Sequence, residues 1–236
     1  MTVTRTTLDD LAPAMDLATL AGLLGSVAFG AIAAAVVLPA WLPGLSQTLT
    51  GDAPKAYWYL SRVSGLVAYA LLWLSMCLGV SLTSRLARLW PGGPVAYDVH
   101  QHTSLIGLAF ALFHGLILLG DQFAAYTPAQ LLVPFASGAY RPVWVGLGQA
   151  GFYGLAVVGL SFYVRSLSGP KFWRALHFAS FLVYGLALLH GVFSGSDSGA
   201  AGVRFFYWVT GGSLLFLISY RTLIQRIRRP NAGPGR

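Results

Sequence analysis

Six long stretches of apolar residues, separated by short polar segments, dominate the pattern along the chain. Each approaches or exceeds the roughly 20 residues that a helix needs to span a bilayer. They lie at about 17–42, 57–82, 99–119, 143–164, 176–193 and 203–224. The first stretch is too long for the core of a signal peptide, so we interpret it as a retained helix. The pattern predicts an all-α integral membrane protein, a six-helix bundle forming one domain over residues 1–236.

Composition agrees with this prediction. Hydrophobic residues make up 56% of the chain and charged residues 9%, against about 25% charged in a typical soluble domain. Membrane lipid is therefore an expected partner. The net charge of +8 does not indicate nucleic acid, because the basic residues flank the apolar stretches as topogenic charges do.

The basic residues also predict an orientation. One set of segment ends carries eleven of them: Arg5, Arg85, Arg88, Arg165, Lys171, Arg174, Arg221, Arg226, Arg228, Arg229 and Arg236. The opposite set carries four: Lys55, Arg62, Arg141 and Arg204. The richer side is expected in the cytoplasm. The protein is then a multi-pass protein of the cell (inner) membrane with both termini cytoplasmic and a basic tail at 225–236.

Four histidines form two pairs at matched depths. His100 and His114 lie 14 residues apart in the third stretch, and His177 and His190 lie 13 apart in the fifth. Both stretches cross in the same direction, so the two levels are separated by about 20 Å in each helix. Ionisable groups in a bilayer are costly and mark functional sites. Neutral imidazole is a common haem ligand, so the pairs predict two stacked b-type haems between helices three and five.

The sequence predicts the depth of these histidines more clearly than the direction in which their side chains point around the helix axis. Fourteen residues return a helix to within about 40° of its starting face, whereas thirteen leave it about 140° away. The fifth helix then needs a rotation, a kink, for which Gly185 is a candidate, or a different side-chain reach. His102 is an alternative to His100 as the inner ligand. The histidines can also be read as structural groups that hydrogen-bond between helices.

Other kinds of site have little support in the sequence. Cys77 is the only cysteine, which excludes a CxxCH haem attachment and a cysteine-based zinc site. There is no HExxH, GxSxG, Walker or GxGxxG pattern, so hydrolase, kinase and nucleotide-binding functions are not indicated and no catalytic residue is predicted. A zinc or di-iron centre would need carboxylates or closer histidines.

With these motifs, the chain resembles the ferric reductase-like transmembrane domain family, whose relatives include the NADPH oxidases. The resemblance covers roughly residues 57–221. It rests on the following segments: 61–69 (SRVSGLVAY), Asp98 to His100, His114, Asp121, 132–135 (LVPF), 140–142 (YRP), 173–177 (WRALH), His190-Gly191 and 195–197 (GSD).

The resemblance implies that His100 pairs with His177 at an inner haem and His114 with His190 at an outer haem. It favours His100 over His102, because the family has the same 14- and 13-residue spacings. The chain also resembles the bacterial membrane haem subunit of a periplasmic methionine sulfoxide reductase. That family lacks the equivalent of His100, so two haems are expected here.

Haem propionates need cationic partners. Arg62 is the candidate near the outer haem, and Arg174 is the candidate near the inner one. Lys171 also precedes His177, but interfacial anchoring explains it more simply.

The function that follows is transmembrane electron transfer by the haem-containing membrane component of an oxidoreductase. We expect no FAD or NAD(P)H site in this chain, so a cytoplasmic flavoprotein or a quinol would supply electrons. The acceptor would lie on the outer side, with a periplasmic redox protein as one possibility. The alternatives are a quinol-linked superoxide or quinone oxidoreductase, and a non-redox membrane subunit with structural histidines.

Overall fold

The structure is a computed structural model that describes residues 12–41, 56–84, 86–121, 124–138 and 140–228. Every regular element in these ranges is a helix. Six helical segments within them are long and apolar enough to cross a membrane, which supports a multi-pass membrane protein. These spans are Leu17–Val37, Ala56–Ser84, Gly93–Gly120, Pro142–Ser168, Pro170–Ser194 and Ala201–Ile227.

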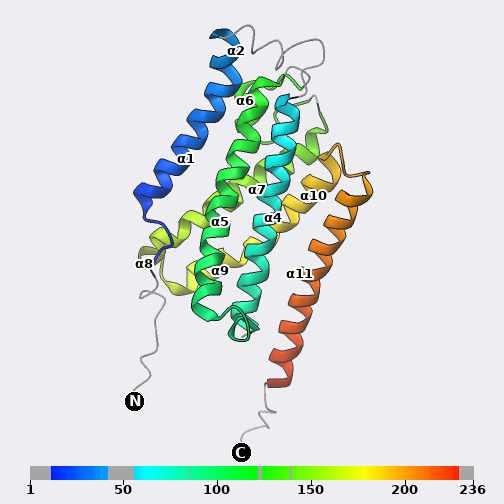
Figure 1. The fold of residues 1–236 in the computed structure, drawn as a ribbon. Coiled ribbons are helices and arrows are strands. Elements are labelled where there is room, and N and C mark those ends of the chain that lie inside the picture. The colour runs from blue at the N-terminus through cyan, green and yellow to red at the C-terminus, as the bar shows by residue number, and fades with distance from the viewer. Residues whose placement is uncertain (1–11, 42–55, 85, 122–123, 139, 229–236) are drawn as a thin grey trace, which may run out of the picture.

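The helices form one bundle around an antiparallel central pair (Figure 1). α4 (Ala56–Ser84) and α5 (Gly93–Leu116) lie side by side along their length. α7 (Pro142–Leu160) packs against α10 (Ser180–Ser194), and α11 (Ala201–Arg228) covers α4. α1 (Leu17–Ile32) packs on α5 and continues through the π-helix η2 (Ala33–Val37) into α2 (Leu38–Trp41).

Two ends of the bundle need names. α1 begins and α11 ends at the same end, which we call the termini end (Figure 1). The opposite end, where α4 and α11 begin, is the loop end. It carries η4 (Ile117–Gly120) and the short helix α6 (Pro128–Leu132).

Proline helps to set where three helices begin. Pro94, Pro142 and Pro170 occupy the first turns of α5, α7 and of α9 (Pro170–Phe178). A proline there loses no hydrogen bond, because the first backbone N–H groups of a helix have no intrahelical acceptor. The fifth span therefore starts at Pro170, earlier than the predicted residue 176, and α9 includes Lys171 and Arg174.

The predicted tail begins later than expected. α11 continues to Arg228, so residues 225–228 are helical. Residues 229–236 lie outside the described residues, as do Arg5, Lys55 and Arg85, which the predicted orientation counted.

A chain of buried hydroxyl groups ties α4, α10 and α11 together at mid-depth. The Tyr69 and Tyr184 hydroxyls lie 2.8 Å apart, and the Tyr69 hydroxyl lies 2.7 Å from the Thr210 hydroxyl. Thr210, which is fully buried, donates to the carbonyl of Phe206. Tyr69 therefore donates to Thr210 and accepts from Tyr184. Each hydroxyl in this apolar region is satisfied by the next.

Thr210→Val removes the acceptor of the Tyr69 hydroxyl without changing side-chain shape much. We expect it to lower the free energy of unfolding in mixed micelles by about 0.5–2 kcal/mol, the range of hydrogen bonds between membrane helices. Thr222→Val is the matched control, because Thr222 is exposed on the same helix. Equal stability of the two variants would contradict this account.

Candidate functional site

Two pairs of histidine rings face each other across the bundle. The ring centres of His100 and His177 are 6.0 Å apart, and those of His114 and His190 are 5.9 Å apart. The rings of each pair are nearly perpendicular, with interplanar angles of 77° and 76°. The His100–His177 pair lies nearer the termini end and the His114–His190 pair nearer the loop end. The depth prediction and the predicted pairing of these residues thus agree with their positions.

A break in the fifth span lies between its two histidines. α9 ends at Phe178 and α10 begins at Ser180, so the break at Ala179 separates His177 from His190. There the backbone N–H of Ala179 bonds to the carbonyl of Leu176, three residues back. This turn is tighter than the α-helical turns on either side of it. Gly185, the predicted candidate for a kink, lies inside the continuous helix α10, so the break occurs six residues earlier in the chain.

Helix α4 supports both histidines of α5 through its backbone. His114 Nδ1 lies 2.7 Å from the carbonyl oxygen of Ser61, and His100 Nδ1 lies 2.8 Å from that of Ser75. A carbonyl only accepts, so in both rings Nδ1 carries the proton. Nε2 is then the unprotonated nitrogen in each ring and keeps its lone pair for a ligand.

His190 is held in the same way by α7. Its Nδ1 lies 2.9 Å from the carbonyl oxygen of Trp144. His177 differs, since it has no hydrogen-bond partner among the described residues and stacks on Trp173 instead, with ring centres 5.1 Å apart. Three of the four rings are therefore fixed in both tautomer and direction.

A glycine makes each of these three contacts possible. Gly65, Gly79 and Gly148 follow the three accepting residues by four positions, one helical turn. A Cβ on Gly65 would lie 2.8 Å from His114 Nδ1, and one on Gly79 would lie 3.2 Å from His100 Cε1. A Cβ on Gly148 would overlap the ring of His190. We call this arrangement, a carbonyl at one position and a glycine four residues later, the carbonyl–glycine cradle.

The spacing of the paired rings fits a metal ion bound between two imidazoles. With metal–nitrogen bonds of about 2.0–2.1 Å, and about 1.1 Å from the nitrogen to its ring centre, opposed rings would have centres about 6.2–6.4 Å apart. The observed 6.0 and 5.9 Å are close to this value. No group of three or more His, Cys, Asp or Glu side chains suited to a metal occurs among the described residues. A centre with two histidine ligands and a prosthetic group, such as haem, suits the donor set better than a bare metal ion.

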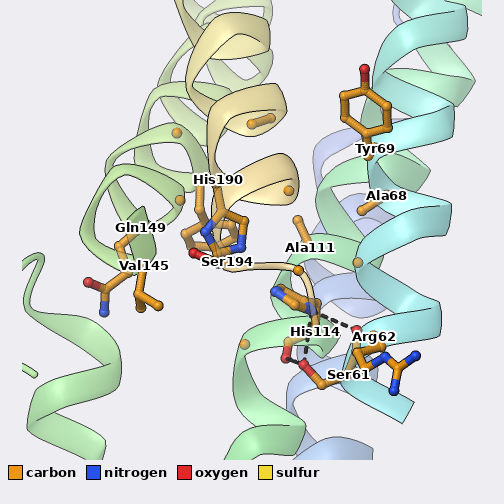
Figure 2. Close-up of a pocket in the computed structure, with 18 of the residues that line it drawn as sticks. Ser61, Arg62, Ala68, Tyr69, Ala111, His114, Val145, Gln149, His190 and Ser194 are labelled. Atoms are coloured by element: carbon orange, nitrogen blue, oxygen red, sulfur yellow. Dashed lines mark hydrogen bonds between the residues drawn. The ribbon is translucent and has the colours of Figure 1, made fainter. Parts of the chain in front are cut away.

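A cavity of about 260 Å³ surrounds the pair nearer the loop end (Figure 2). Both His114 and His190 line it, and the mostly apolar wall extends to Tyr69 and Leu72 near mid-depth. Its loop end is polar, with Arg62, Asp197 and Ser194 in the wall. A flat apolar group with charged substituents at one edge has complementary surroundings here.

Arg62 lies where the sequence suggested, at the polar end of this cavity. Its guanidinium forms an ion pair with Asp197 and lies over the Tyr59 ring, 5.4 Å from the centre. Tyr126, in the connection before α6, also lines the cavity. Burial raises the pKa of the Tyr126 phenol, so this side chain is a neutral donor near the arginine.

Arg174 and Lys171 are placed less favourably for the inner pair. Both are on α9 with exposed side chains, and Arg174 precedes His177 by three residues. The structure does not bring either cation into contact with the paired rings.

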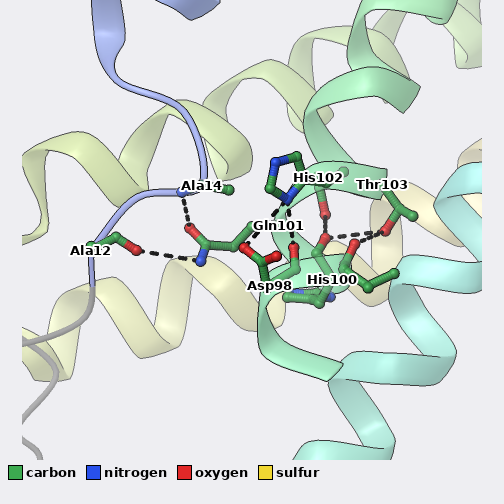
Figure 3. A network of polar contacts seen from close by, with 9 residues as sticks. Ala12, Ala14, Asp98, His100, Gln101, His102 and Thr103 are labelled. Atoms are coloured by element: carbon green, nitrogen blue, oxygen red, sulfur yellow. Dashed lines mark hydrogen bonds and ion pairs between the residues drawn. The ribbon is translucent and has the colours of Figure 1, made fainter. Parts of the chain in front are cut away.

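His102 extends from α5 in a different direction from His100 (Figure 3). Its Nδ1 lies 3.0 Å from the carbonyl oxygen of Asp98 and 3.4 Å from an oxygen of the Asp98 side chain. The neighbouring Gln101 accepts from the backbone N–H of Ala14 and donates to the carbonyl of Ala12. This face of α5 holds the segment before α1, and His100 rather than His102 lies opposite His177.

The supporting serines and glycines were not singled out from the sequence as a repeated pattern. Ser61 and Gly65 recur 14 residues later as Ser75 and Gly79, the same interval that separates His100 from His114. Comparing intervals between neighbouring stretches would have found this match.

Comparisons with known proteins add no family assignment: no protein-family model, curated protein or solved structure matches this chain.

Gly148→Ala tests the carbonyl–glycine cradle. The added methyl group would displace the ring of His190. The binding of added haem b that the sequence predicts at the His114–His190 pair should therefore fall at least tenfold, about 1.4 kcal/mol. Titration of the Soret absorbance measures the effect. Gly159→Ala, on the same helix with open space around it, should bind haem like the parent protein. Equal loss in both variants would mean that the ring does not depend on this glycine.

Proposed function

We propose that this protein is a two-haem membrane cytochrome b that transfers electrons between the two sides of a membrane. The observation that carries the proposal is the pair of opposed imidazoles at each of two depths, with ring centres 6.0 and 5.9 Å apart. A histidine that only bridged helices in an apolar bundle would be expected to satisfy both of its ring nitrogens with protein partners. Here the hydrogen bonds of three rings go through Nδ1 to backbone carbonyls, and Nε2 stays available.

Each side chain has a distinct part in this proposal. His100 and His177 would ligate one haem, and His114 and His190 the other. The haem, when bound, supplies reversible one-electron chemistry. The carbonyls of Ser61, Ser75 and Trp144 fix the tautomer and orientation of three ligands and raise their basicity, as partners of ligating histidines do elsewhere. The apolar wall of the cavity around the pair nearer the loop end excludes water and lowers the local dielectric.

The arrangement along the bundle supports transfer across the membrane. The two histidines of α5 lie 14 residues apart, which is about 21 Å along a helix. One pair is therefore near each end of spans that are 21–29 residues long. Electrons can pass between two such centres without moving any part of the protein.

The direction proposed is from the cytoplasm outward, from a cytoplasmic flavoprotein or a quinol to an acceptor outside. The uneven distribution of basic residues supports a cytoplasmic termini end. Within the described residues, the loop end carries Arg62, Arg141 and Arg204. The likeness to ferric reductase-like domains supports the direction of flow.

Haem content is the first test. We expect the purified protein, supplied with haem during expression, to show a b-type reduced-minus-oxidised spectrum and two haems per chain. His114→Ala or His190→Ala should leave one haem, and His100→Ala or His177→Ala should remove the other. His102→Ala is the matched control and should keep both, because its ring lies on another face of α5. A protein without b-type absorption would disprove the proposal.

Transfer across a bilayer is the second test. In vesicles with ferricyanide trapped inside, we expect an impermeant reductant outside to reduce it only when the protein is present. His114→Ala should abolish this activity, because one of the two centres is lost, whereas His102→Ala should keep it. If the protein binds two haems but reduces the trapped ferricyanide no faster than empty vesicles do, the proposed cofactor would stand and the proposed transfer across the membrane would be disproved.

A further inference from the structure

Two buried hydrogen-bond donors without partners lie beside the inner histidine pair, His100 and His177. They are the hydroxyl of Tyr97 and the indole N–H of Trp173. Neither atom is accessible to solvent, and neither has a hydrogen-bond partner among the described residues. Buried polar groups of folded proteins are almost always paired, so two such donors at one site indicate a missing acceptor.

Both donors sit in corresponding places relative to the paired rings. Tyr97 precedes His100 by three residues on α5, and Trp173 precedes His177 by four residues on α9. Each is thus about one helical turn nearer the termini end than its histidine. The Trp173 ring stacks on that of His177, with an interplanar angle of 24°. The stacking holds the indole beside the inner pair.

A cation completes this group. The Arg165 guanidinium lies 3.9 Å from the centre of the Phe162 ring, and that ring contacts Trp173 edge to face at 6.3 Å. The Arg165 Nη1 donates to the carbonyl of Phe162. Arg165 therefore lies on the Trp173 side of this group, whereas Arg174, which was predicted from sequence for this role, is exposed.

The pair nearer the loop end has a similar arrangement. Ser194 follows His190 by four residues, and its buried hydroxyl has no partner among the described residues. It lines the cavity together with Arg62. At both levels, an unpaired donor and an arginine thus lie beyond the histidines, toward the nearer end of the bundle.

We propose that Tyr97, Trp173 and Arg165 bind the carboxylate edge of a flat, apolar ligand held between His100 and His177. This inference rests on the proposed function, in which that ligand is haem b and the carboxylates are its propionates. A carboxylate only accepts hydrogen bonds, so a hydroxyl, an indole N–H and a guanidinium match its chemistry. The inner haem would then be oriented with its carboxylates toward the termini end.

Comparing haem b with haem b dimethyl ester, in which both carboxylates are esterified, tests the inference. The readout is haem loss from the purified full-length protein to a scavenging globin, followed in the Soret band. The phase that His100→Ala abolishes belongs to the inner site. We expect Tyr97→Phe and Trp173→Phe each to speed this phase for haem b about tenfold, the effect of losing one hydrogen bond to a charged group. The other phase should not change.

With the dimethyl ester, we expect the inner phase to be fast in the parent protein and nearly unchanged by either substitution. Tyr220→Phe and Trp208→Phe, on α11, are matched controls and should match the parent protein with both ligands. Equal acceleration for haem b and its ester would show that Tyr97 and Trp173 only pack against the ring, and would overturn the inference. Unchanged loss of haem b would overturn it as well. In both cases the two-haem proposal stands, whereas absence of any haem would instead remove the proposed function itself.

Discussion

The hydrogen bond from a histidine Nδ1 to a helix carbonyl is the interaction on which the site depends. A carbonyl inside a helix already accepts the backbone N–H four residues later, and its second lone pair is normally shielded by the side chain at that position. Glycine at that position removes the shield. The imidazole can then reach the carbonyl, as His114 does at Ser61 and Gly65. In an apolar bundle this satisfies one ring nitrogen and leaves the other for a ligand.

The same interaction accounts for how closely the helices pack. At Gly65 and Gly148 the ring of a histidine occupies the space where a Cβ would otherwise lie. α4 thus holds the ring of His114 and α7 that of His190, each through backbone atoms. The two rings that these helices hold have centres 5.9 Å apart. Backbone support of this kind is stiffer than support from long side chains.

His177 shows what happens where this support is lacking. Among the described residues, no carbonyl accepts a hydrogen bond from the His177 ring. The ring stacks on the side chain of Trp173 instead. Stacking fixes the plane of the ring but does not select a tautomer. The ring of His177 is therefore less constrained than that of His190.

Depth was predictable from the sequence, because it depends only on counting residues along helices whose rise is constant. Six spans and the matching of His100 with His177 and of His114 with His190 followed from such counting. The break at Ala179 was not predictable, since alanine has no helix-breaking tendency. The exposure of Arg174 was not predictable either, because distance along the chain does not fix the direction of a side chain. Arg174 lies only three residues before His177, but its side chain is exposed on α9.

The repeated interval of 14 residues on α4 and on α5 couples the positions of the two histidine sites. Ser61 with Gly65 and Ser75 with Gly79 lie on one helix, and the rings that they hold lie on one antiparallel neighbour. Antiparallel helices in fixed register bring both cradles to both rings only if the interval is the same on each helix. Fourteen residues are close to four full turns, so the same face of α4 also meets the same face of α5 at both levels. The register that positions one pair therefore positions the other, and neither site can shift along the bundle alone.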